Sequence, residues 1–300
     1  MIELKSISKK FGDVTAVDSV SIEAKAGEIF GLIGPDGAGK TTIFRILTTL
    51  MVADEGEAYV DGKNVVKDYK NIRDIIGYMP GTFSLYQDLS VEENLSFFAS
   101  IFGTTIEANY DLIKDIYQQI EPFKKRKAGA LSGGMKQKLA LSCALIHKPK
   151  VLFLDEPTTG VDAVSRKEFW QMLKRLQDRG ITIIVSTPYM DEASLCDRVA
   201  LIQEGKIMDI DTPSGIINKF GRTLFEVRSE NKYQLIKTLR SMAEVHSAFP
   251  FGDSVHVTCN DNLDPKKLVG LMEDSGLTNV SVQTTTPNIE DCFMSLMTNQ

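Results

Sequence analysis

In the N-terminal part of the chain, apolar residues first recur at every second position and then recur at the three- to four-residue spacing of a helix. Apolar and polar residues alternate over Ile2–Ser8 and Ala16–Ala24, which predicts two strands. Ala58–Val60 leads into an Asp-Gly pair typical of a hairpin turn. A short apolar strand over Glu28–Ile33 stops at a glycine-rich loop, and Thr41–Met51 then carries apolar residues at helical spacing. This part therefore predicts a β-rich region that contains one helix.

Two later apolar runs indicate a parallel sheet. Val151–Leu154 and Thr182–Ser186 lack alternation, which suits strands buried on both faces. Between them lies Ser165–Asp178, an amphipathic segment that predicts a crossover helix ending near Gly180. The middle of the chain, Val91 to His147, is mostly helical by pattern. Together these elements predict a three-layer α/β core with a helical insertion.

The pattern changes again from about Gly221. Short strand and helix patterns then alternate, which predicts a small α+β domain followed by a terminal helix over Ile289–Met297. The segments, in order, are Leu224–Val227, Tyr233–Met242, Ser254–Thr258, Pro265–Glu273 and Val280–Val282. The predicted domains are therefore residues 1–220 and 221–300.

Charge and composition narrow the possible functions. The formal net charge of −6 argues against a nucleic-acid partner, because neutralising phosphates needs a basic face. No apolar run approaches the length of a membrane span, and the N-terminal residues lack the apolar core of a signal peptide. The four cysteines are far apart and form no C-x-x-C pair, which favours free thiols. We therefore expect a cytoplasmic protein.

The glycine-rich loop predicts a phosphate-binding site. It matches the pattern G-x-x-x-x-G-K-S/T, and a following threonine, Thr42, extends it. The matching residues are Gly34, Pro35, Asp36, Gly37, Ala38, Gly39, Lys40 and Thr41. In such a loop, backbone N–H groups turn toward the phosphates, the lysine reaches the β- and γ-phosphates, and the hydroxyl of Thr41 can ligate Mg²⁺. The loop also lies between a predicted strand and a predicted helix, so coincidence is a poor explanation.

Two carboxylates follow the apolar strand Val151–Leu154. Open α/β sheets place ligand chemistry at the carboxyl ends of their strands. Asp155 is the expected Mg²⁺-side carboxylate, and Glu156 is placed to orient or deprotonate the water that attacks the γ-phosphate. An exposed acidic turn is the alternative, but a complete phosphate loop in the same chain disfavours it.

The segment Leu131-Ser-Gly-Gly-Met-Lys-Gln137 resembles the signature of the ABC ATPase family, LSGGQ or a close variant. The resemblance covers about residues 1–220 and implies a P-loop ABC ATPase core, with a parallel sheet, an antiparallel β subdomain and a helical subdomain. In this family Ser132, Gly133 and Gly134 would bind in trans, on the γ-phosphate of ATP held by a second ABC ATPase subunit. The implied ligands are ATP and Mg²⁺, and the other implied partner is a transmembrane permease subunit.

Three further segments resemble family elements. Phe11 matches the aromatic residue that stacks on adenine, with a core aromatic as the alternative. Gly160-Val161-Asp162 matches a loop at the dimer interface, and Tyr86–Phe98 resembles the stretch that contacts the membrane partner. The resemblance implies an ATPase subunit that drives export and lies peripherally on the inner face of the cell membrane. The last eighty residues loosely resemble an extra domain of some exporter subunits, where a dimerisation role, a regulatory role and simple packing remain open.

Two positions depart from the family pattern. Gly81 stands where glutamine is usual, and Pro188 stands where a histidine usually contacts the γ-phosphate. Losing one positioning contact to a transition state commonly costs ~2.7–4 kcal/mol. We therefore expect slow turnover at this chain's own site, within an asymmetric heterodimer that also has a fast site. In a second interpretation, Gln87 or Tyr189 fills the missing roles, and in a third the chain is a non-hydrolysing regulatory or interaction module.

Overall fold

The computed structural model describes residues 1–259 and 264–298, and it divides the chain into two compact units at Pro213/Ser214. The predicted boundary lay at 220/221. The first unit contains an antiparallel sheet with the strand order β2-β1-β4-β5 and a six-stranded sheet with the order β10-β9-β3-β8-β7-β6. The second unit contains a four-stranded sheet. The two units are described separately below.

The antiparallel sheet of the first unit confirms the alternating patterns. It consists of β1 (Ile2–Phe11), β2 (Val14–Ala24), β4 (Glu55–Val60) and β5 (Lys63–Asn64). Strands β1 and β2 form a hairpin whose last pair is Phe11 opposite Val14. Strands β4 and β5 pair around the expected Asp-Gly turn.

The six-stranded sheet carries the loops that form the candidate site. Its strands are β3 (Ile29–Ile33), β6 (Ile76–Met79), β7 (Val151–Asp155), β8 (Thr182–Thr187), β9 (Arg198–Gln203) and β10 (Lys206–Asp211). All neighbouring pairs are parallel except β9 and β10. Asp155 of β7 lies opposite Ser186 of β8, and Ile33 of β3 lies opposite Thr187 of β8. The carboxyl ends of β3, β7 and β8 therefore meet at one edge.

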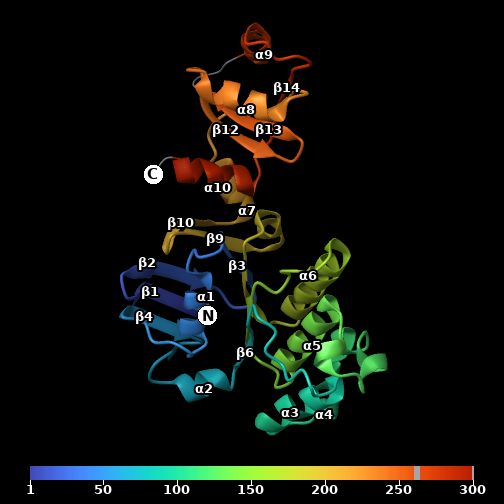
Figure 1. Ribbon diagram of the computed structural model, residues 1–300. Coiled ribbons are helices and arrows are strands. Elements are labelled where there is room, and N and C mark those ends of the chain that lie inside the picture. The colour runs from blue at the N-terminus through green and yellow to red at the C-terminus, as the bar shows by residue number, and fades with distance from the viewer. Residues whose placement is uncertain (260–263, 299–300) are drawn as a thin grey trace. The chain divides into compact units, whose positions relative to one another are not determined.

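Helices cover both faces of this sheet (Figure 1). Helix α1 (Lys40–Leu47) shares one apolar core with the two sheets of this unit, and the rings of Phe44 and Phe153 meet edge to face at 5.8 Å. Helix α6 (Ala163–Asp178) contacts β8, and α5 (Gly133–Leu145) contacts β6. This arrangement confirms the predicted three-layer core.

The predicted helical insertion contains α3 (Val91–Ile101) and α4 (Ile106–Tyr117), which pack on each other and on α5. Ser90 and Glu93 form a reciprocal capping box at the start of α3. A five-residue helix, α2 (Tyr69–Arg73), precedes β6. Three short 3₁₀ turns complete the unit: η1 (Glu121–Phe123), η2 (Ala128–Ala130) and η3 (Met190–Leu195).

The second unit is built on an antiparallel sheet with the order β12-β13-β11-β14. Its strands are β11 (Leu224–Arg228), β12 (Val245–Phe251), β13 (Ser254–Cys259) and β14 (Ser281–Thr285). Its helices are α7 (Pro213–Asn218), α8 (Lys232–Ser241), α9 (Pro265–Asp274) and α10 (Ile289–Thr298). Leu235, Leu239, Leu268 and Met272 of α8 and α9 share a core with the sheet. Asp291 of α10 pairs with His256 of β13 at 2.7 Å, so the terminal helix packs within this unit.

Candidate nucleotide-binding site

The glycine-rich loop joins β3 to α1 at the edge where the parallel strands end. A Cβ atom on Gly34 would lie 2.1 Å from the carbonyl oxygen of Ile202, so no larger residue fits there. Gly39 has φ 101°, and a Cβ atom on it would lie 2.3 Å from the carbonyl oxygen of Ala16. Both glycines are therefore required by close backbone contacts, and Gly39 is also required by its positive φ.

Helix α1 begins directly after Gly39, which makes no side-chain cap. Its first backbone N–H groups therefore point out of the helix start, as anion-binding helix starts require. Thr41 and Thr42 lie in this first turn and are partly buried. Pro35, Asp36, Gly37 and Ala38 form the loop in front of it, and Gly37 has φ 80° with open space around it. The predicted phosphate-loop residues thus form one continuous cradle.

Lys40 is 3% exposed, and three oxygen atoms surround its ammonium group. Nζ donates to the carbonyl oxygens of Gly34 at 2.8 Å and Pro35 at 3.0 Å. It also lies 3.2 Å from Oε1 of Glu156. The structure therefore brings together the two residues that the sequence assigned to phosphate binding and to water activation.

Asp155 and Glu156 lie at the end of β7, and Ser186 of β8 holds both. Ser186 Oγ donates to Asp155 Oδ1 at 2.5 Å, and the Glu156 N–H donates to the Ser186 carbonyl oxygen at 3.0 Å. Glu156 has φ 49°, in the left-handed region that non-glycine residues seldom occupy. Burial and the nearby charge of Asp155 raise the pKa of Tyr78 on β6 to about 12.

The residues present fit a magnesium ion bound together with its substrate. Thr41 supplies a hydroxyl and Asp155 a carboxylate, and Mg²⁺ is commonly held by one or two protein oxygens plus substrate phosphates and waters. Over residues 1–259 and 264–298 no group of three or more His, Cys, Asp or Glu side chains could hold a metal by itself. A site completed by phosphate oxygens agrees with both observations.

A buried carboxylate that the sequence did not predict ties two loops of the site together. Glu192 in η3 is 1% exposed. It accepts hydrogen bonds from Thr158 Oγ1 at 2.7 Å and Thr187 Oγ1 at 2.6 Å. Arg166 Nε of α6 lies 3.7 Å from Glu192 Oε1. Thr158 follows Glu156 by two residues and Thr187 ends β8, so Glu192 fixes both loops; no periodic pattern marks it.

Gly81 lies beside the carboxylate strand and leaves space there. A Cβ atom on it would lie 3.2 Å from the Asp155 carbonyl oxygen and 3.9 Å from Glu156 Cβ. A pocket of about 220 Å³ opens at this point, and its lining includes Gln137 of α5. Neither Gln87 nor Tyr189 lines this pocket.

The two candidate substitutes have other contacts. The main-chain carbonyl oxygen of Gln87 accepts a hydrogen bond from the Gly129 N–H at 2.9 Å, and the side-chain Oε1 of Gln87 would lie 3.6 Å from a Cβ atom on Gly129. The ring of Tyr189 packs against Arg166, whose guanidinium carbon lies 4.3 Å from the ring centroid. Pro188, between Thr187 and Tyr189, has no side-chain donor. The structure therefore does not bring either candidate into the space beside Gly81.

The signature residues begin α5. Ser132 is exposed and caps the helix, with its Oγ accepting from the Met135 N–H at 3.4 Å. A Cβ atom on Gly133 would lie 3.6 Å from the Gly160 carbonyl oxygen, and one on Gly134 would lie 3.2 Å from Ser165 Oγ. The signature thus packs beside the Gly160–Asp162 loop of its own chain, where Asp162 caps α6.

Phe11 ends β1 and is exposed, with Lys9 Nζ 5.8 Å from its ring centroid. The alternative interpretation, that Phe11 is an aromatic residue of the core, is therefore wrong. The hairpin that carries it approaches the phosphate loop through Ala16, which touches Gly39. Phe11 is therefore a surface residue on a hairpin whose second strand contacts the phosphate loop.

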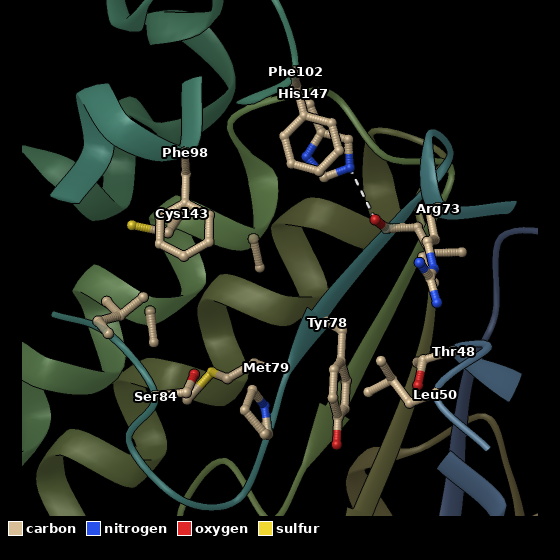
Figure 2. A pocket seen from close by; sticks show the side chains of 15 residues that line it. Thr48, Leu50, Arg73, Tyr78, Met79, Ser84, Phe98, Phe102, Cys143 and His147 are labelled. Atoms are coloured by element: carbon tan, nitrogen blue, oxygen red, sulfur yellow. Dashed lines mark hydrogen bonds between the residues drawn. The ribbon is translucent and has the colours of Figure 1, made fainter. Parts of the chain in front are cut away.

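A second pocket of about 360 Å³ lies between β6, α3 and α5 (Figure 2). Phe98 and Phe102 line it from α3, and His147 stacks on Phe102 with ring centroids 3.8 Å apart. His147 Nε2 makes a hydrogen bond with the Ile76 carbonyl oxygen at 2.9 Å, and burial lowers the pKa of this histidine. The pocket therefore has a mainly aromatic and apolar wall.

A search of the described helices for one that is long and apolar enough to cross a membrane returns none.

Comparison with known proteins gives a consistent result. The family model "ABC transporter" matches residues 17–159. The probable multidrug ABC transporter ATP-binding protein YbhF of Escherichia coli (strain K12) is 37% identical over 303 residues, which cover 99% of this chain. The chain spans only 52% of that relative's length. Nod factor export ATP-binding protein I of Burkholderia lata is 34% identical, with 98% of this chain and 96% of the relative covered.

Solved structures agree with these sequence relatives. An ATP-binding cassette solved as a dimer in a post-hydrolysis state, bound to ADP and Pi, matches with a TM-score of 0.64 and 27% identity. The match covers 71% of this chain and 98% of that one. The fold prediction is thereby confirmed, and this chain belongs to the family of ABC transporter ATP-binding proteins.

Proposed function

We propose that this chain binds and hydrolyses MgATP to drive export through a separate membrane subunit. The names of its relatives support the direction of transport: Nod factor export in Burkholderia lata, and linearmycin resistance in Bacillus subtilis, where the relative is 31% identical and 98% covered. The proposal places the protein in the cytoplasm, on the inner face of the membrane.

The main support for this proposal is the short distance between the side chains of Lys40 and Glu156. The buried ammonium group of Lys40 lies 3.2 Å from the carboxylate of Glu156, at the carboxyl ends of the parallel strands. From this position the two groups could reach a terminal phosphate and the water that attacks it. Lys40 and the amides of the glycine loop hold the phosphates, and Glu156 takes the proton from the water. Bound at Thr41 and Asp155, Mg²⁺ would neutralise charge on the phosphate oxygens.

The signature supports a second subunit as partner. Ser132 and Gly133 are exposed at the start of a thirteen-residue helix, so their hydroxyl and amides can bind an anion that approaches from outside the chain. In the proposed dimer they cap the ATP of the opposite subunit, and Phe11 stacks on the adenine of its own. The opposite subunit is a second copy or a related ATPase.

The pocket between β6, α3 and α5 is the proposed docking site of the membrane subunit. Its wall includes Phe98 of the Tyr86–Phe98 stretch, together with Leu85. Tyr86 and Phe97 are exposed beside it and meet edge to face at 4.9 Å. Exposed aromatic residues around an apolar pocket suit an amphipathic helix of a partner.

Two matched substitutions test the hydrolytic proposal. Glu156→Gln should retain ATP binding and ATP-dependent dimerisation but lose hydrolysis about a hundred-fold or more. Lys40→Ala should lose binding itself. Equilibrium binding of labelled ATP, light scattering with and without MgATP, and phosphate release would be measured on the same preparations. Unchanged phosphate release from Glu156→Gln would overturn the role of this residue.

Slow turnover is a second candidate property, favoured by the space beside Gly81. The pocket there contains no glutamine from the β6 loop, and Pro188 offers no donor at the end of β8. A slow site in this chain, combined with its intact signature, would produce an asymmetric pair when it assembles with a related subunit. Phosphate release from the purified chain alone, compared with release from the pair, tests this.

A further inference from the structure

A third pocket, of about 630 Å³, lies on α6 and η3. We call it the α6 pocket. Its apolar wall includes Ile29, Trp170 and Leu195, and its polar wall comes from charged residues of the same two elements. Arg166, Trp170 and Lys174 follow one another at four-residue spacing on α6, so one stripe of that helix forms much of the lining. Its volume is in the range of small-molecule sites.

Two buried N–H groups of residues that line this pocket have no hydrogen-bond partner. Trp170 is 5% exposed, and its indole Nε1 is buried and unpartnered. Nε of Arg166 is likewise buried without a hydrogen bond, although Glu192 lies 3.7 Å away. Buried donors are seldom left unsatisfied, because each costs about 1–3 kcal/mol. Both donors are therefore unsatisfied by the residues that the structure describes.

The charges of the pocket favour an anionic acceptor. Lys167 is exposed, and it has no ion pair within the described part of the chain. Lys174 Nζ donates to Gln177 Oε1 at 2.7 Å and lies 3.6 Å from Asp197, and both partners are outside the lining. The two acids of the lining, Asp191 and Glu192, are both turned to Arg166 at 3.7 Å. Lys167 is therefore the lining lysine that remains unpaired by the described residues and is available to a ligand.

We propose that the α6 pocket binds a single-chain amphiphilic carboxylate, such as a medium-chain fatty acid. The alkyl chain lies against Trp170, Leu195 and Ile29, and the carboxylate accepts from Lys167 at the rim, with Lys174 on the same helix stripe beside it. A neutral ligand would leave the lysines unused, and a cationic one would be repelled by them.

The pocket is also connected to the proposed catalytic loops. Arg166 faces Glu192, and Glu192 holds Thr158 and Thr187. A carboxylate that draws Arg166 away from Glu192 changes the support of both loops, and we expect it to change the rate of ATP hydrolysis. This coupling rests on the proposed function, whereas binding to the pocket does not.

Intrinsic fluorescence tests binding directly, because Trp170 is the single tryptophan of the chain. The full-length protein is titrated with decanoate below its micelle concentration, and in parallel with decanol and decyltrimethylammonium. We expect a saturable change in the Trp170 emission with decanoate and none, or a much weaker one, with the other two. No saturable change with decanoate, or equal binding of decanol, overturns the proposal.

Substitutions locate the carboxylate. Lys167→Gln together with Lys174→Gln should weaken decanoate binding about three- to tenfold. Arg175→Gln on the same helix is the matched control, since Arg175 does not line the pocket and pairs with Asp115 at 3.7 Å. Equal affinities of all three proteins would contradict the proposed site. Phosphate release is then measured with decanoate: an unchanged rate alongside saturable binding removes only the coupling.

Discussion

Glu192→Gln is the substitution whose effect follows most directly from the structure. The side chain keeps its shape but loses one carboxylate oxygen, and the new amide nitrogen cannot accept from a threonine hydroxyl. The two hydroxyl bonds of 2.7 and 2.6 Å are buried, and Arg166 loses its charged neighbour at 3.7 Å. Losing one hydrogen bond to a charged group costs about 1.5–3 kcal/mol.

For a domain of this size, each kcal/mol lowers the melting temperature by about 2–4 °C. We therefore expect the first unit to melt roughly 3–12 °C lower in Glu192→Gln, measured by differential scanning calorimetry of the full chain. Asp191→Asn is the control, because the Asp191 side chain is 74% exposed and contacts the same arginine at 3.7 Å. Asp191→Asn should change the free energy of unfolding by no more than about 0.5 kcal/mol. A melting temperature of Glu192→Gln equal to that of the control would refute the role of Glu192 in holding the two loops.

Three further predictions follow from the site. Gly34→Ala should abolish ATP binding or folding, because its Cβ would lie 2.1 Å from the Ile202 carbonyl oxygen; ATP binding and circular dichroism would detect this. Tyr78 ionises at about pH 12 in the folded chain but at about pH 10 when unfolded, so stability should fall as the pH rises above about 10. Urea unfolding should show a smaller fall for Tyr78→Phe, and equal falls would contradict the assignment. Gly81→Gln with Pro188→His should raise phosphate release at least about tenfold; no gain would exclude these positions as the cause of slow turnover.

The strands of the nucleotide site could be predicted because each one is a short run of consecutive, mostly apolar residues, which is typical of a buried strand. Val151–Leu154 and Thr182–Ser186 are apolar on both faces, and the structure pairs them in parallel in the centre of the sheet as β7 and β8. The phosphate loop is equally local, since all its residues are consecutive. The sequence also predicted α8, β13 and α9 of the second unit to within a few residues.

Features that depend on distant contacts were missed. Glu192 looks like a surface acid next to Asp191, and only the fold brings Thr158 and Thr187 to its two oxygens. Strand β12 contains Pro250 and a register shift, so its pattern does not resemble a regular strand.

The contact between Gly39 and Ala16 has a consequence for how the family can vary. The oxygen that Gly39 faces is the main-chain carbonyl oxygen of Ala16 on β2. Nearby, the Asp18 N–H donates to the Gly205 carbonyl oxygen and the Gly205 N–H donates to the Ala38 carbonyl oxygen, so these contacts are also main-chain hydrogen bonds. The spacing between the hairpin of Phe11 and the glycine loop is thus fixed without any particular side chain on β2. The exposed positions of that strand can therefore change while the two halves of a nucleotide cradle keep their separation, provided that the glycines and the buried β2 side chains persist.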